Sequence, residues 1–260
     1  MTVNIWVGRA PQGYEAQALR QVAASAIEAG VDCHLFANFL VSGREIDLLL
    51  LKRDGIFLVE LKQVGGVVRG AINGDWSVGD GRTRQILAGG SHANPYQQML
   101  SQYRVLTEWL EAHKQSFLEP YAASVTHFRP DKRRRHAPAK IRSLLAFYPQ
   151  LPAGSALSLD WKVEAVGMAE MTQIVVQEST PRVSLIEPEI VALARQLNLK
   201  PWALQAAAPA HRVQTRSTRE RWLDAKLSLI ERLIRRLDSY RQQLHAQRRN
   251  ECFTTASQAP

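Results

Sequence analysis

The sequence is poor in cysteine and has no long apolar run, and each absence excludes a class of protein. It contains two cysteines, Cys33 and Cys252, in 260 residues. That number excludes a disulfide framework and a cysteine-rich zinc module. No apolar stretch approaches the roughly 18 residues that a membrane span needs. The N-terminus has no charged region followed by an apolar one, as a signal peptide would. We therefore expect a cytoplasmic protein that does not cross a membrane.

Motifs that bind nucleotides are also missing. The sequence has no P-loop, no G-x-G-x-x-G fingerprint and no protein-kinase motif. The histidines at positions 34, 92, 113 and 136 show no metal-ligand spacing. Cys33 is expected to pack as a small apolar residue.

Basic residues are in excess, and the excess is concentrated in two segments. The chain has 33 Lys and Arg against 24 Asp and Glu, a net charge of +9. Residues 129–142 hold seven basic side chains and one acidic, and residues 211–250 hold eleven and four. Such patches suggest a phosphate-rich partner such as DNA, although a basic loop or helix is more often a solvated face. In the first segment, a solvated loop is an equally good interpretation. Its candidate DNA contacts are Lys132, Arg133, Arg134 and Arg135.

The first hundred residues predict a helix followed by a strand hairpin. Residues 14–29 have a helical pattern, and Gly30 is a helix-ending residue. Four consecutive leucines at 48–51 predict a strand covered on both faces, in the middle of a sheet. The buried face of the helix is expected to hold Leu19, Val22, Ala23 and Ile27. The expected strands are 33–41, 45–52, 56–62, 66–70 and 75–78, with a turn at 53–55 and a loop at 80–91.

The following segments complete one α/β domain over residues 1–202. A second helix is expected at 95–114, with Pro95 near its start. Further strands are expected at 141–148 and 161–167, and a helix at 187–198. This order of helices and strands is typical of a mixed α/β domain.

The C-terminal part has a different pattern. Residues 203–216 read as a linker, and residues 251–260 as a disordered tail. Between them, residues 217–250 repeat apolar positions at 4-3 spacing over about three heptads. A short coiled coil and a helix packed on the domain or on a partner are equally compatible with this pattern. The segment is therefore a candidate for homodimer formation or partner binding.

The predicted hairpin carries the candidate catalytic residues. Glu60 and Lys62 are two positions apart on a strand, so their side chains point to the same face. The tight turn places Asp47 nearly opposite Glu60 or Leu61. Two carboxylates and an ammonium among apolar neighbours are costly to bury without a reason. An isolated E-x-K is usually a surface ion pair, but the apolar flanks and Asp47 favour a functional site.

Paired carboxylates repel each other unless a cation lies between them. Oxygen ligands suit Mg²⁺ or Mn²⁺. A neighbouring lysine can orient a water molecule or neutralise charge on a phosphate. This set of groups is typical of metal-assisted phosphodiester hydrolysis.

The segment GREIDLLLLKRDGIFLVELKQVGG resembles the core of the nuclease-related domain family, a branch of the PD-(D/E)XK nucleases. The resemblance extends from about Tyr14 to Leu110. It implies a restriction-endonuclease-like core, a central mixed sheet flanked by helices, here with a helical extension. Its signals are Glu15, Glu45, Asp47, Glu60, Lys62, Trp76, Asn94, Pro95 and Gln98.

The resemblance also implies roles. Asp47, Glu60 and the backbone carbonyl of Leu61 would hold the metal, and Lys62 would be the catalytic lysine. Glu15 and Gln98 match a first-helix acid and a second-helix glutamine of the family's active site. The expected function is Mg²⁺- or Mn²⁺-dependent hydrolysis of DNA, in DNA processing or defence against foreign DNA. The alternative is a non-catalytic DNA-binding or assembly module.

Glu45 has two interpretations. It is two positions from Asp47 on the same strand, so it could lie beside the metal ligands and orient them without binding the metal. It could instead form an ion pair with Arg44 or Arg53, and this second interpretation is favoured.

Overall fold

The computed structural model describes residues 2–79, 84–128, 141–180 and 184–203. The predicted linker beyond Ala203, the helix at 217–250 and the tail at 251–260 lie outside these ranges. So does most of the basic segment, including Lys132, Arg133, Arg134 and Arg135.

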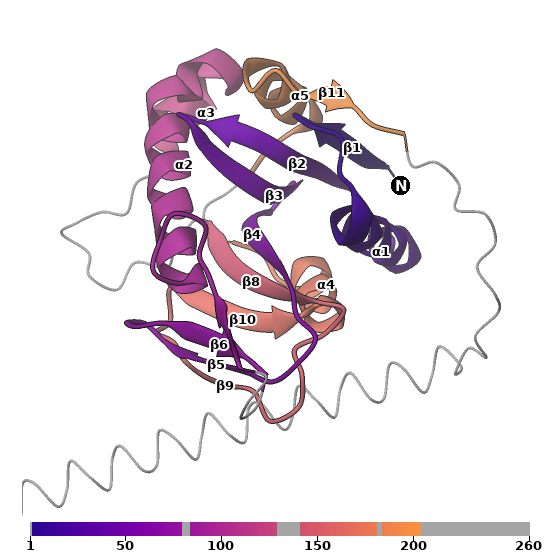
Figure 1. Cartoon of the computed structure of the whole chain (residues 1–260). Helices are drawn as coiled ribbons and strands as arrows, with labels where there is room; N and C mark the ends of the chain where they lie inside the picture. The colour runs from indigo at the N-terminus through magenta and orange to yellow at the C-terminus, as the bar shows by residue number, and fades with distance from the viewer. Residues whose placement is uncertain (1, 80–83, 129–140, 181–183, 204–260) are drawn as a thin grey trace, which may run out of the picture. The chain divides into compact units, whose positions relative to one another are not determined.

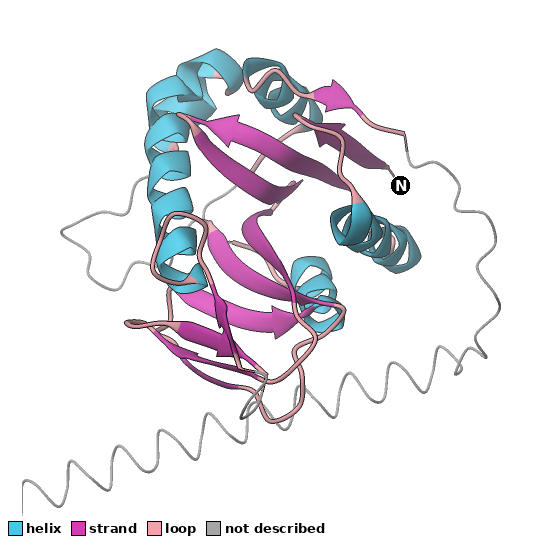
Figure 2. Cartoon of the chain, in the orientation of Figure 1, coloured by secondary structure: helices cyan, strands magenta, loops and turns pink. Residues whose placement is uncertain are grey.

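A seven-stranded mixed sheet forms the centre of the domain (Figures 1 and 2). Its strand order is β10-β8-β4-β3-β2-β1-β11. β3 is antiparallel to both neighbours, whereas β1–β2, β4–β8 and β8–β10 are parallel pairs. The strands are β1 Val3–Val7, β2 Cys33–Val41, β3 Arg44–Lys52, β4 Gly55–Gln63, β8 Arg142–Tyr148, β10 Val163–Gly167 and β11 Lys200–Pro201.

Helices cover both faces of this sheet. The buried apolar side chains form two clusters. One cluster includes side chains of α1 and α4, and the other includes side chains of α2 and α5. Leu48 and Leu50 belong to the first cluster, and Leu49 and Leu51 to the second. The alternation of a strand therefore divides the four leucines between two cores, as the sequence predicted. The helices are α1 Gly13–Ala29, α2 Pro95–Phe117, α3 Pro120–Val125, α4 Met168–Gln177 and α5 Glu187–Gln196.

A smaller four-stranded sheet, β7-β6-β5-β9, lies beside the start of α2. Its strands are β5 Val68–Ala71, β6 Trp76–Val78, β7 Gln85–Leu87 and β9 Ala156–Ser158. Trp76 is fully buried, and a Cβ atom on Gly70 would lie 2.5 Å from its indole ring. Asn94 caps α2 by accepting from the Gln97 N–H at 2.9 Å, and its amide donates to the Gly74 carbonyl at 2.8 Å. Asn94 therefore ties the small sheet to the helix that carries Gln98.

Glu111 on α2 holds the segment after α3 in place. Its carboxylate accepts hydrogen bonds from Lys114 at 2.8 Å and from the Phe128 backbone N–H at 2.7 Å, and contacts His127 at 3.4 Å. Burial alone would raise the pKa of Glu111, but these contacts outweigh it and lower the pKa to about 2.

Most of the predicted elements are confirmed within a few residues. The first helix ends at Gly30, which adopts the left-handed conformation with φ of 72°. Two predictions are wrong. Ile27 is 53% exposed, because the buried face of α1 passes through Ala26 instead. The expected loop at 80–91 contains β7, which pairs with β6. The elements β1, α3, α4, β9 and β11 were not predicted.

Candidate active site

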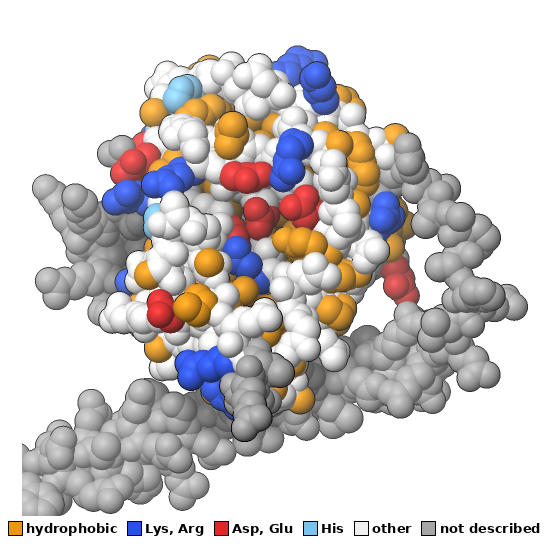
Figure 3. All heavy atoms as spheres, in the orientation of Figure 1, with side chains coloured by type: hydrophobic (Ala, Val, Ile, Leu, Met, Phe, Trp, Pro, Cys, Tyr) orange, Lys and Arg blue, Asp and Glu red, His pale blue; other side chains and the backbone are white. Residues whose placement is uncertain are grey.

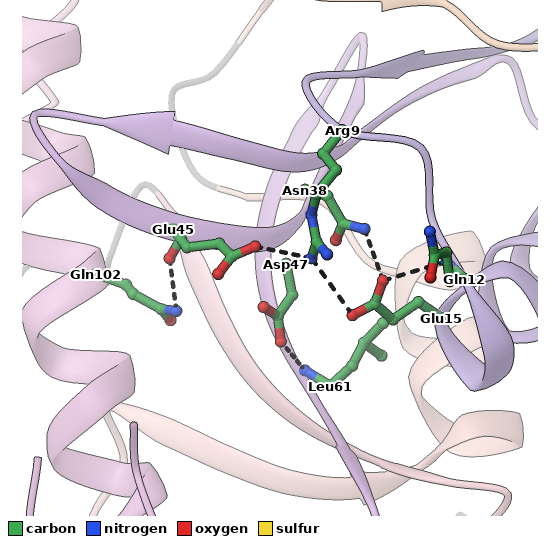
Figure 4. A network of polar contacts seen from close by, with 8 residues as sticks. All are labelled: Arg9, Gln12, Glu15, Asn38, Glu45, Asp47, Leu61 and Gln102. Carbon is green, nitrogen blue, oxygen red and sulfur yellow. Dashed lines mark hydrogen bonds and ion pairs between the residues drawn. The ribbon is translucent and has the colours of Figure 1, made fainter. Parts of the chain in front are cut away.

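The candidate site lies where β3 and β4 separate. Their pairing runs from Lys52 opposite Gly55 to Leu48 opposite Val59, and no pairing continues beyond it. At the next position the carboxylate of Asp47 replaces a strand partner, accepting a hydrogen bond from the Leu61 N–H at 2.9 Å (Figure 4). The two-residue turn thus sets the register, and the separation of the strands gives Asp47 room beside β4.

Glu60 and Lys62 point to the same side of β4, toward α2. Lys62 Nζ donates to Glu60 Oε1 at 2.6 Å and to Gln98 Oε1 at 3.1 Å. Glu60 is 1% exposed, and the Lys62 side chain is 16% exposed. Lys62 is therefore held by a carboxylate and an amide while part of it still reaches solvent.

Gln102, one turn after Gln98 on α2, holds the second oxygen of Glu60. Its Nε2 donates to Glu60 Oε2 at 2.6 Å and to the Glu45 backbone carbonyl at 3.0 Å. The residue is 3% exposed, and its Oε1 has no hydrogen-bond partner among the described residues. A buried unpartnered oxygen costs free energy, so Gln102 contributes through the two bonds of its amide nitrogen.

Glu15 reaches the same region from α1, which covers the opposite face of the sheet. Its Oε2 accepts a hydrogen bond from Asn38 Nδ2 at 2.7 Å, and Arg9 lies 3.9 Å from its Oε1 (Figure 4). Asn38 is 5% exposed and has φ of 51°, a left-handed conformation that non-glycine residues rarely adopt. Between the pairs Ala37–Leu48 and Phe39–Ile46, the position of Asn38 is level with Asp47. At this distorted position of β2, the Asn38 side-chain amide points toward Glu15.

Burial and a neighbouring carboxylate change the protonation of Asp47. Burial is the largest cause that raises the pKa of Asp47, and the charge of Glu60 adds to it. The Leu61 N–H and Lys62 act in the opposite direction, and the resulting pKa is about 8. In the absence of a cation, Asp47 therefore favours its protonated form at neutral pH.

The Tyr14 hydroxyl lies within the electrostatic influence of four carboxylates. Burial raises the pKa of this hydroxyl to about 12, and the charges of Asp47, Glu15, Glu60 and Glu45 contribute in that order. Four carboxylates from α1, β3 and β4 thus act on one hydroxyl. In Figure 3, acidic side chains gather near the middle of the visible face, with basic side chains close by.

These groups fit a hard divalent cation that keeps part of its water. Within the described ranges, no group of three or more His, Cys, Asp or Glu side chains is arranged as a metal site. Asp47 and Glu60 are two carboxylates, and Leu61 adds a backbone carbonyl. Mg²⁺ is commonly bound by one or two carboxylates and several waters rather than by a complete protein cage. The donor set is thus compatible with Mg²⁺ or Mn²⁺.

The structure brings together the described residues that the sequence singled out on β3, β4 and α2. Lys62 touches Glu60 and Gln98, and Asp47 bonds the backbone of Leu61. Glu45 was expected to pair with Arg44 or Arg53, and this is wrong. It pairs with Arg9 at 3.0 Å, while Arg44 donates to Ser91 Oγ at 3.2 Å.

Three neighbours were missed by sequence reasoning: Arg9, Asn38 and Gln102. Each is distant in the chain from its partner, by 36, 23 and 42 residues for the contacts with Glu45, Glu15 and Glu60. Gln102 had one usable signal, because it lies four residues after Gln98 and therefore on the same helix face. Asn38 had a weaker one, a polar residue inside an apolar strand.

The last described residue of the basic segment, Arg142, is engaged inside the domain. It lies on β8 and pairs with Glu164 and Glu178. Arg142 therefore does not share the DNA-contact interpretation of its neighbours at 132–135.

No helix in the described ranges combines the length and apolar character needed to cross a membrane.

Comparison with known proteins agrees with the geometry. The family model described as nuclease-related domain matches residues 12–147, just over half of the chain. The matched range includes α1, the β3–β4 hairpin, α2 and β8. No curated protein and no solved structure showed a significant similarity. The match of the family model over this length means that the chain belongs to the nuclease-related domain family.

Proposed function

We propose that this protein is a metal-dependent nuclease that hydrolyses DNA phosphodiester bonds. The observation that carries the proposal is the arrangement at the separation of β3 and β4. Asp47 and Glu60 lie together there, and Lys62 bridges Glu60 and Gln98. The mixed sheet with helices on both faces is compatible with a restriction-endonuclease-like core. We propose such a core for this domain.

Each residue has a role that follows from its position. Asp47, Glu60 and the carbonyl of Leu61 would hold Mg²⁺ or Mn²⁺. The bound ion would supply charge neutralisation at the phosphate and a more acidic water. Lys62 would orient the attacking water and stabilise negative charge on the phosphate, because its ammonium is fixed by two acceptors. Gln98 keeps Lys62 in place.

Lys132, Arg133, Arg134 and Arg135 would add affinity through phosphate contacts that do not depend on sequence. Such binding weakens steeply as the salt concentration rises. The segment 217–250 would form a homodimer or bind a partner protein.

The test is cleavage of supercoiled plasmid and linear duplex DNA by purified protein with Mg²⁺, Mn²⁺ or EDTA. Asp47→Asn and Lys62→Gln remove the two charges with little change of shape. Their matched controls are Asp54→Asn, at the tip of the same hairpin with a 61% exposed side chain, and Lys162→Gln, with a 50% exposed side chain. We expect metal-dependent cutting in the wild type and both controls, and its loss in both site variants.

Other results would contradict the proposal. Equal cutting by Asp47→Asn and by the wild type would mean a contaminating nuclease or a different site. DNA binding without cutting under any metal condition would favour the alternative, a DNA-binding or assembly module.

A further inference from the structure

Four carboxylates and two cations are connected around the proposed site. The carboxylates are Glu15, Glu45, Asp47 and Glu60, all of which act on the Tyr14 hydroxyl. Among the described side chains joined to them by ion pairs, Lys62 neutralises Glu60 and Arg9 contacts both Glu15 and Glu45. With every group charged, four negative and two positive charges leave a balance of −2. One divalent cation matches that balance.

Arg9 lies between two of these carboxylates. Its Nη2 is 3.0 Å from Glu45 Oε1 and 3.9 Å from Glu15 Oε1, so one guanidinium bridges these two acids (Figure 4). A guanidinium is charged at every working pH, and its donors suit two carboxylates at once.

The backbone holds Arg9 in this position. The Gly8 N–H donates to the Ala37 carbonyl at 3.0 Å, and the Arg9 N–H donates to the Asn38 carbonyl at 2.9 Å. A Cβ atom on Gly8 would lie 2.7 Å from that Asn38 oxygen, so glycine permits the close approach. Arg9 is thus anchored to β2 beside the distorted residue that orients Glu15.

Stability alone is a weak reason for this ion pair. The Arg9 side chain is 59% exposed and that of Glu45 is 54% exposed. Exposed ion pairs contribute little to folding. Their effect on where a cation binds can be larger, since a fixed positive charge repels a metal ion directly.

We propose that Arg9 is a positioning residue that acts as a resident cation, so that the site takes one divalent ion and not two. The inference rests on the proposed function, because it assumes that Asp47 and Glu60 bind the first ion. Without Arg9, Glu15 and Glu45 become available as oxygen ligands for a second ion.

The test counts Mn²⁺ bound to the metal-free full-length protein. Calorimetric titration gives the stoichiometry, and the paramagnetic resonance signal of free Mn²⁺ gives an independent count. The variants are Arg9→Gln, which removes the charge, and Arg9→Lys, which keeps it. Arg195→Gln makes the same change at an exposed arginine on α5. We expect one ion per chain in the wild type, Arg9→Lys and Arg195→Gln, and two in Arg9→Gln.

Two further variants identify the sites. Adding Glu15→Gln to Arg9→Gln should return the count to one, because the second ion loses its ligand. Asp47→Asn should lose the first ion. Arg9→Gln should unfold at nearly the wild-type temperature, which separates metal counting from a structural defect.

Each contrary outcome has a distinct meaning. Two ions in the wild type, or one ion in Arg9→Gln, would overturn the role of Arg9 and leave the metal site intact. A second ion that persists in the Arg9→Gln, Glu15→Gln double variant would also overturn it. No Mn²⁺ binding by any protein would instead overturn the metal site of the proposed function, and this inference with it.

Discussion

Replacing Gln102 by methionine tests whether its amide holds Glu60 in place. Methionine has similar length and no hydrogen-bonding amide, so the substitution removes the bonds to Glu60 Oε2 and to the Glu45 carbonyl. A hydrogen bond to a charged group contributes about 1.5–3 kcal/mol, and a bond to a backbone carbonyl about 1 kcal/mol. Removing the unpartnered Oε1 recovers about 1 kcal/mol. The net loss in the free energy of unfolding is about 2 kcal/mol.

For a domain of this size the loss corresponds to a fall of about 4–8 °C in Tm. The assay is thermal and urea unfolding in EDTA, so that no metal compensates. Gln98→Met is the matched control one turn earlier, and its cost should stay below about 1 kcal/mol because Gln98 and Lys62 are partly exposed. A double-mutant cycle with Glu60→Gln should show a coupling of at least about 1 kcal/mol between positions 60 and 102.

The reasoning would be refuted by a Gln102→Met protein as stable as the wild type. That result would mean that the desolvation of the amide cancels its hydrogen bonds. Equal losses for Gln102→Met and Gln98→Met would refute the argument from burial as well.

Substitutions at Asn38, Gly70 and Glu111 test three separate features by unfolding experiments. Asn38→Gly keeps the left-handed backbone and loses the amide, so it should cost less stability than Asn38→Ala, by about 1 kcal/mol; equal losses would show that backbone strain is unimportant there. Gly70→Ala should destabilise by about 1–3 kcal/mol because its Cβ meets Trp76, whereas Gly65→Ala, with nothing within 4 Å, is the control and should be neutral. Glu111→Gln should lose about 2 kcal/mol at pH 7, because solvent screening of this partly exposed carboxylate reduces the roughly 3 kcal/mol that its pKa shift corresponds to. The pKa of Glu111 is lowered from 4.5 to about 2, so its contribution is complete above about pH 4.5 and disappears as pH falls toward 2. A difference between Glu111→Gln and the wild type that persists unchanged at pH 3 would contradict this assignment.

Local sequence was sufficient for the hairpin. Strand alternation placed Glu60 and Lys62 on one face, and their side chains are 2.6 Å apart. The short turn after Lys52 fixed the pairing so that Asp47 reached Leu61. These relations involve residues close in the chain, for which the geometry of a strand and a turn leaves few choices.

Other elements were beyond the reach of local patterns. β1 and β11 are short, and each acquires its partners only through the strand order of the sheet. Ile27 was assigned to the buried face of α1, but that face depends on where the sheet lies, and it runs through Ala26. Periodicity indicates that a helix is amphipathic more reliably than it locates the edge of its buried stripe.

The family, the mixed α/β class and the approach of Asp47, Glu60 and Lys62 to one another follow from local sequence, because they depend on alternation, turn geometry and residue chemistry. The residues that surround those three side chains follow only from the three-dimensional fold. Arg9, Asn38 and Gln102 come from a loop, a distorted strand and a helix on different sides of the sheet. Their convergence depends on strand order and on the separation of β3 and β4, which no local pattern encodes.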